Sequence, residues 1–181
     1  MDNNLVPLLE LLKASSQKLK DRWCKQLLYK LNIIHNSFEN VKYMICFDNL
    51  MIDRNNNLVL INVSDKPCLM RKLQDYTDFK APELVGSSIR SKAGDIWAAG
   101  ICIYYINNLC FPWKIAANTD KRYCMWANEG LFPSSSENSY TQVLKQMLCV
   151  DPQLRPSVKD VIKSVHKFEE DQHDLSELLF F

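Results

Sequence analysis

One segment of this chain is apolar on nearly every side when it is drawn as a helix, and this feature limits the folds that the chain can adopt. Between residues 96 and 106 the apolar side chains are Ile96, Trp97, Ala98, Ala99, Ile101, Ile103, Tyr104 and Ile106. A helix with no polar face must be covered by other elements on all sides. Ser91 can cap such a helix, which would run to about Asn107. The run is shorter than the ~20 residues needed to cross a bilayer, so we predict a helix at the centre of a soluble domain.

The flanking segments predict a mostly α domain with a small β-hairpin. We expect a short amphipathic helix over residues 5–13 and a longer one from Ser15 or Ser16 to about His35, because apolar positions recur every three or four residues. The β-prone runs 49–52 and 58–61 flank an Asn-rich spacer that suits a tight turn. Residues 64–80 are expected to be irregular, and turns and aromatics follow Phe111. Further helices are expected at about 139–149 and 157–168. One domain over residues 1–168 and a tail over 169–181 complete this interpretation.

Charge and cysteine usage exclude several classes of function. The chain has 22 Lys and Arg against 21 Asp and Glu, so no field attracts nucleic acid or anionic lipid. The 7 cysteines are scattered without Cys-x-x-Cys spacing and there are only 3 histidines, so we expect no disulfides and no metal cluster. The N-terminus lacks the basic start of a secretory signal. We therefore expect an intracellular protein that binds neither nucleic acid nor membrane.

Four short motifs occur in a fixed order along the chain. They are Asp48-Asn49-Leu50-Met51-Ile52-Asp53, Leu60-Ile61-Asn62-Val63-Ser64, Ala81-Pro82-Glu83 followed by Asp95-Ile96-Trp97-Ala98-Ala99-Gly100, and Met147-Leu148-Cys149-Val150-Asp151-Pro152-Gln153-Leu154-Arg155-Pro156-Ser157. Each motif alone is weak, because a lone Ala-Pro-Glu occurs by chance in many chains. Their order and separations carry the signal.

Together these motifs resemble the large, C-terminal lobe of eukaryotic-type protein kinases over about residues 1–168. The stretch from Phe111 to Trp126 is more similar to the serine/threonine branch than to the tyrosine branch. The resemblance implies that Glu83 pairs with Arg155, and that Asp95 accepts hydrogen bonds from the backbone of the catalytic loop. Those three residues, with Trp97 beside Asp95 in the motif, are expected to be structural.

The resemblance also implies that the catalytic positions are degenerate. The His-Arg-Asp motif falls on Lys42-Tyr43-Met44, the catalytic-loop lysine falls on Cys46, and Asp-Phe-Gly falls on Asn62-Val63-Ser64. A thioether cannot accept the proton of a substrate hydroxyl, and magnesium prefers anionic oxygen to an amide. We therefore expect no catalytic or metal site and no bound cofactor, with Asn49 and Met51 as remnants of the nucleotide site.

Three carboxylates near these positions have two interpretations. Asp48, Asp53 and Asp65 lie close to the degenerate positions in sequence. One of them could substitute as a metal ligand, or each could be a solvated turn residue.

The small lobe of a kinase is expected to be missing. The 4 glycines do not have Gly-x-Gly-x-x-Gly spacing, and Met1 to Leu5 resembles the hinge between the lobes. The reading frame is then either truncated, with Met1 an internal methionine, or a genuine short form.

Two main functions follow from the resemblance. The first is a catalytically inactive module, a pseudokinase, that binds a protein such as a kinase or a kinase substrate. Its partner could contact an exposed cleft floor around Met51 and residues 5–12, unless the tail residues Leu178, Leu179 and Phe181 cover that floor. The second is a truncated form of an active serine/threonine kinase that uses ATP and magnesium. A decaying gene product with no selected role is a third alternative.

Overall fold

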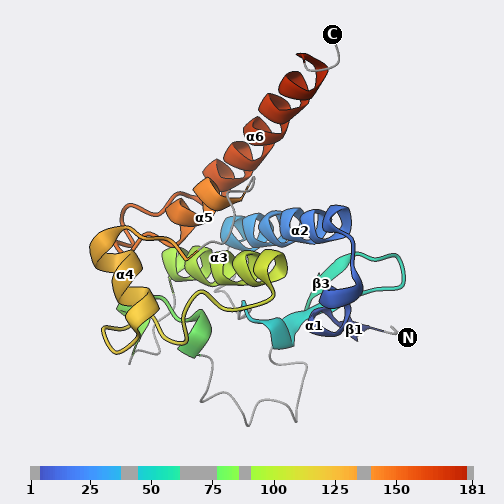
Figure 1. Ribbon diagram of the computed structural model, residues 1–181. Helices are drawn as coiled ribbons and strands as arrows, with labels where there is room; N and C mark the ends of the chain where they lie inside the picture. The colour runs from blue at the N-terminus through green and yellow to red at the C-terminus, as the bar shows by residue number, and fades with distance from the viewer. Residues whose placement is uncertain (1–4, 38–44, 62–76, 86–90, 134–139, 179–181) are drawn as a thin grey trace.

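The computed structural model describes residues 5–37, 45–61, 77–85, 91–133 and 140–178, with side chains in the last stretch described as far as Phe168. The fold is mostly helical, with a small antiparallel sheet at one end (Figure 1). The helices and strands are β1 Val6–Pro7, α1 Leu8–Leu11, α2 Gln17–Asn36, β2 Leu50–Ile52, β3 Leu58–Leu60, α3 Lys92–Asn108, α4 Lys121–Glu129, α5 Thr141–Met147 and α6 Val158–Leu178. No helix among these residues is long and apolar enough to cross a membrane.

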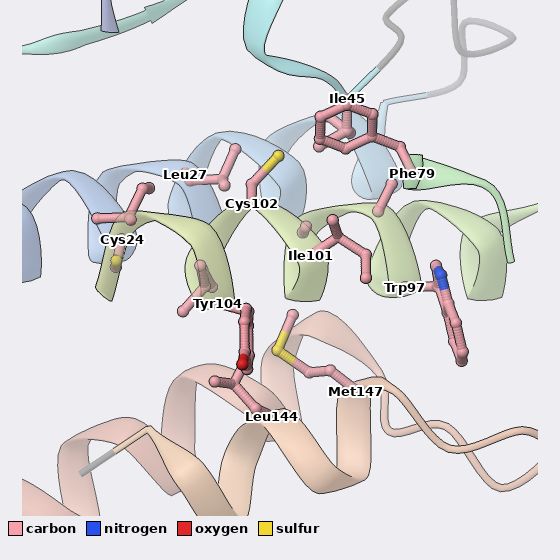
Figure 2. Packing of buried hydrophobic residues seen from close by; sticks show 14 of the residues in the cluster. Cys24, Leu27, Ile45, Phe79, Trp97, Ile101, Cys102, Tyr104, Leu144 and Met147 are labelled. Carbon is pink, nitrogen blue, oxygen red and sulfur yellow. The ribbon is translucent and has the colours of Figure 1, made fainter. Parts of the chain in front are cut away.

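Helix α3 is the central apolar helix that the sequence predicts. The Ser91 hydroxyl caps it by accepting a hydrogen bond from the Gly94 N–H at 2.9 Å. Side chains on every side of α3 are buried, with α2 on one side and α5 on the other (Figure 2). At Gly100 the α5 end comes so close that an added Cβ would lie 3.0 Å from the Leu148 side chain. The prediction of a buried central helix is confirmed.

Helix α2 also follows its prediction, and it holds the hairpin in place. The Ser16 hydroxyl accepts a hydrogen bond from the Leu19 N–H, and the expected apolar stripe faces the core. Trp23 donates from its indole N–H to the Asn56 carbonyl at 3.1 Å, and the Leu58 N–H donates to the Gln26 side chain at 2.7 Å. These bonds orient the β2–β3 hairpin against the first half of α2.

The sheet has one strand more than predicted. Val6 lies opposite Ile52 and Pro7 lies opposite Met51, so β1 joins the hairpin in the order β1-β2-β3. The expected helix over residues 5–13 is therefore wrong at its start, and α1 is a single turn followed by a 3-10 turn. Strand pairing prevails over helical periodicity here, and proline is tolerated because β1 is an edge strand.

The hairpin turn forms as the Asn-rich spacer predicts. Asn56 adopts the left-handed conformation, with φ of 59°. The Asp53 carboxylate accepts hydrogen bonds from the N–H groups of Asn55 and Asn57, both at 2.8 Å. These bonds, that with Asn57 foremost, lower the pKa of Asp53. Of the two interpretations of Asp53, a metal ligand or a turn residue, the structure shows the turn residue. Asp65 lies outside the described residues.

The C-terminal part differs from its prediction in two places. Helix α4 forms where turns were expected, because Asp120 caps its first turn and Gly130 ends it with φ of 69°. Helix α6 does not end at residue 168 but continues to Leu178, so the expected tail begins inside a helix.

Of the segment 64–80, which is expected to be irregular, Thr77–Lys80 are described, and Thr77–Phe79 form a 3-10 turn.

Candidate functional site

Residues 45–49, which the resemblance aligns with the end of the catalytic loop, form a turn that leads into β2 and is buried except at Asp48. Cys46 is fully buried, and Phe47–Asn49 form a 3-10 turn in which the Asn49 N–H donates to the Cys46 carbonyl at 3.1 Å. The Ile61 N–H donates to the Asn49 carbonyl at 2.9 Å, which fastens the turn to the end of β3. The Asn49 side chain is buried as well. Lys42, Met44 and Asn62 lie outside the described residues.

An aromatic cluster holds this turn against α3. The Phe47 ring lies edge-on to Phe79 at 5.6 Å, to Tyr105 at 4.9 Å and to Phe111 at 6.2 Å between ring centroids. Such contacts each contribute about 0.5–1.5 kcal/mol beyond the area that they bury. The four rings come from four separate segments, so no spacing in the sequence reveals the cluster. It fixes the turn relative to the segment that leads into Pro82.

The thiols around Cys46 belong to the apolar core. Cys24 and Cys102 are buried free thiols, from α2 and α3. Burial raises the pKa of the Cys102 thiol well above its usual value, and the neighbouring Cys46 and Cys24 add to the shift. Burial likewise raises the pKa of Cys24. Cys102 and Cys24 therefore stay protonated and uncharged near neutral pH.

Met51 lies half-buried in the middle strand of the sheet. Its partners in register are Pro7 on β1 and Val59 on β3. Figure 1 shows α6, which ends at Leu178, leading away from this sheet. Leu179 and Phe181, the other residues that could cover Met51, lie outside the described part of the chain.

Glu83 and Arg155 form the ion pair that the resemblance implies. The two terminal nitrogens of Arg155 donate to the two carboxylate oxygens of Glu83 at 2.6 and 2.7 Å. The Arg155 side chain is 0% exposed and that of Glu83 is 25% exposed. Arg155 also donates to the carbonyl oxygens of Ala93, Cys149 and Val150 at 2.8–3.1 Å. One guanidinium therefore ties the Pro82 turn to the start of α3 and the end of α5.

Asp95 and Trp97 line the same region from α3. Asp95 is buried and lies 3.2 Å from the Nε2 atom of His35, near the end of α2. The Trp97 ring is fully buried, with the Arg155 guanidinium 4.8 Å above its centroid. His35 is a partner that the sequence does not single out. The expected hydrogen bonds from the catalytic-loop backbone to Asp95 stay a prediction, because residues 42–44 of that loop lie outside the described part of the chain.

A comparison with protein families identifies this arrangement. The family described as the protein kinase domain matches residues 2–167 of the chain. The chain belongs to the protein kinase family.

Curated relatives of this kinase domain are serine/threonine kinases. The ovarian-specific serine/threonine-protein kinase Lok of Drosophila melanogaster is 28% identical over 132 residues, which are 65% of this chain and 28% of the relative. The serine/threonine-protein kinase ppk34 of Schizosaccharomyces pombe is 23% identical over 160 residues, 84% of this chain and 45% of the relative. A calcium and calcium/calmodulin-dependent serine/threonine-protein kinase of Lilium longiflorum is 27% identical over 90 residues, 48% of this chain and 17% of the relative. The chain thus spans less than half the length of each of these relatives.

At the positions that align with the family's magnesium ligands, this kinase domain carries two amides, Asn49 and Asn62, by sequence. Where the family carries a lysine, Cys46 contributes a buried thiol, and Asn49 contributes a buried amide. Among the described residues no three His, Cys, Asp or Glu side chains gather in a way that could hold a metal ion. Asn62, the second aligned ligand, is another amide by sequence. Magnesium in kinases is held by at least one carboxylate, which the two amides do not supply.

Proposed function

We propose that this protein kinase domain is catalytically inactive and acts by binding another protein, as a regulator, decoy or scaffold in a kinase pathway. The observation that carries the proposal is the set of uncharged side chains at Met44, Cys46 and Asn62. Phosphoryl transfer depends on a base near the substrate hydroxyl, a cation near the phosphates and anionic metal ligands. These three positions supply none of them.

The burial of Cys46 supports the proposal. A lysine at this position would need its ammonium group in water or beside an anion, whereas Cys46 is fully buried near the Cys102 thiol. The adjacent Phe47 is held in an aromatic cluster. The surroundings of the position are thus suited to an uncharged residue.

A second function is favoured by the scaffold and by the relatives. The Glu83–Arg155 pair is intact, and the relatives are serine/threonine kinases that extend well beyond this chain. The alternative is therefore that the chain is part of an active serine/threonine kinase that uses ATP and magnesium. In that case a carboxylate outside the aligned positions, such as the exposed Asp48, must act as the base or ligand.

Phosphate transfer by the longest polypeptide that contains this sequence separates the two functions. That polypeptide is purified from its host cell and incubated with labelled ATP, magnesium and a generic serine/threonine substrate. A variant with Met44→Asp, Cys46→Lys and Asn62→Asp is the matched control. We expect no transfer to the substrate or to the polypeptide itself above the level of a heat-treated sample. Magnesium-dependent transfer by the unaltered polypeptide would overturn the proposal.

A further inference from the structure

Helix α6 has two halves of opposite charge. The half from Val158 to Lys167 contains three lysines, one histidine and one aspartate, whereas the half from Glu169 to Leu178 contains five acids, one histidine and no lysine or arginine. The change occurs at Phe168. The acids are Glu169, Glu170, Asp171, Asp174 and Glu177. Negative charge near the C-terminal end of a helix opposes the helix dipole, so the acidic half gains stability from a cationic neighbour.

The two halves also differ in their relation to the rest of the molecule. Val158, Val161 and Val165 are buried, and the first half contacts α2 and α5. The second half continues in the same direction beyond the ends of the other helices, away from the body (Figure 1). A projecting helix half gains little from the hydrophobic packing that stabilises most helices in proteins.

The basic half lies along a seam with α2 that carries positive charge and apolar surface. Lys25 and Tyr29 of α2 face Ile162 and His166 of α6 across it, and the Tyr29 hydroxyl lies 2.7 Å from the His166 Nε2 atom. Tyr29 is 44% exposed, and Ile33 one turn further along α2 is 68% exposed.

At the start of α6 the seam opens into a pocket of about 380 Å³. Lys92 and Lys159 line it, and none of the described residues that line it is Asp or Glu. The seam and the pocket together thus suit an acidic, partly apolar segment.

We propose that the occupant of this seam is the acidic half of α6 from a second copy of the chain. Two α6 helices that cross antiparallel at Phe168 place residues at equal distances from Phe168 opposite one another. Lys159 would then face Glu177 of the other copy, His166 would face Glu170, and Lys167 would face Glu169. The same contacts form twice around a two-fold axis, which is the usual symmetry of homodimers. The two halves have nearly equal lengths, so each basic half accommodates one acidic half, which favours a second copy over an unrelated acidic protein.

This self-association is independent of whether the domain transfers phosphate. It is tested with the 181-residue chain by sedimentation velocity over a range of protein concentrations. We expect a dimer whose dissociation constant rises with salt, since exposed charge pairs are screened. A chain that stays monomeric at all concentrations would overturn the proposal, and so would a dimer that does not respond to the charge changes described next.

Charge reversal in each half provides the decisive comparison. One variant carries Lys159→Glu, Lys163→Glu and Lys167→Glu, and a second carries Glu169→Lys, Glu170→Lys and Glu177→Lys. Each alone places like charges opposite one another at positions 159 and 177 and at positions 167 and 169, and is expected to raise the dissociation constant by about 100-fold or more. The two variants mixed in equal amounts are expected to form a heterodimer. The matched control, Lys13→Glu with Lys18→Glu and Lys121→Glu, changes three exposed lysines outside α6 and should dimerise normally.

A zero-length carbodiimide cross-link between Lys159 and Glu177 keeps the proposal testable if either variant fails to fold. Within one helix these residues are 18 positions apart, or about 27 Å, so the cross-link cannot form inside one chain. Mixed light and heavy isotope-labelled chains should give a mixed Lys159–Glu177 product. Its absence from a wild-type dimer would contradict the antiparallel arrangement.

Discussion

Replacing Arg155 with alanine removes a fully buried guanidinium together with all of its hydrogen bonds. Glu83 loses its counter-charge, and the carbonyl oxygens of Ala93, Cys149 and Val150 lose their donor. Removing one side of a buried ion pair costs about 3–5 kcal/mol. The Glu83 side chain is 25% exposed and can regain some water, which lowers the cost, while the three carbonyl groups raise it. We expect the free energy of unfolding to fall by about 4 kcal/mol.

Urea and thermal unfolding followed by circular dichroism measure this loss. For a chain of this length 1 kcal/mol corresponds to about 2–4 °C, so Tm should fall by about 8–16 °C. Glu83→Gln should cost less, because Arg155 keeps its three backbone acceptors. Arg122→Ala, which removes an exposed guanidinium on α4, is the matched control and should leave Tm nearly unchanged. An Arg155→Ala variant that melts within about 2 °C of the parent would refute the structural role of the pair.

Three further substitutions test the local accounts of the fold. Asp120→Ala removes the cap of α4 and should lower stability by about 1 kcal/mol near neutral pH, as measured by urea unfolding. Burial raises the pKa of Asp120, but hydrogen bonds from the backbone of Lys114 and Tyr123 outweigh it and lower the pKa. The difference in stability between the variant and the parent should therefore shrink as the pH falls below about 4. Gly100→Val should cost about 1–3 kcal/mol in the same assay, because the Met147 and Leu148 side chains leave no room for a larger side chain; an unchanged midpoint would show that the contact is loose. Burial raises the pKa of Tyr104 to about 12, so its phenol ionises first in the unfolded chain, and stability should fall as the pH rises from about 10 toward 12. Tyr104→Phe should show a smaller fall between about pH 9 and pH 11 in urea titrations, and an equal fall would contradict the assignment.

The parts of the fold that sequence reasoning predicts are those with a strong local signal. Helix α3 has no polar face and begins at a serine cap, and α2 combines a cap with an apolar stripe, so both are predicted within a few residues. The Glu83–Arg155 contact spans 72 positions, and no local pattern indicates it. The contact is predicted only by the resemblance to protein kinases, in which the motif around Glu83 pairs with the motif around Arg155.

The parts that sequence reasoning misses depend on contacts between distant segments. Strand β1 lies in the segment 5–13, whose apolar positions have the periodicity of a helix, and only its pairing with β2 makes it a strand. Helix α4 has a capping aspartate and a terminal glycine that could have identified it, but the surrounding aromatics obscure its periodicity. The contact between the Phe47 and Phe79 rings forms only in the folded chain, so the sequence alone does not indicate it. The same holds for His35 beside Asp95.

The absence of magnesium-dependent nucleotide binding is the central claim, and the melting temperature of the chain with and without ATP and magnesium tests it most directly. A ligand at ~100 times its dissociation constant stabilises a folded protein by ~2.7 kcal/mol, which is a shift of about 5–11 °C here. Because the amides at Asn49 and Asn62 give magnesium no anionic ligand, we predict no shift that depends on magnesium, and the same result for Asn49→Ala. A magnesium-dependent rise of several degrees that Asn49→Ala abolishes would contradict the account.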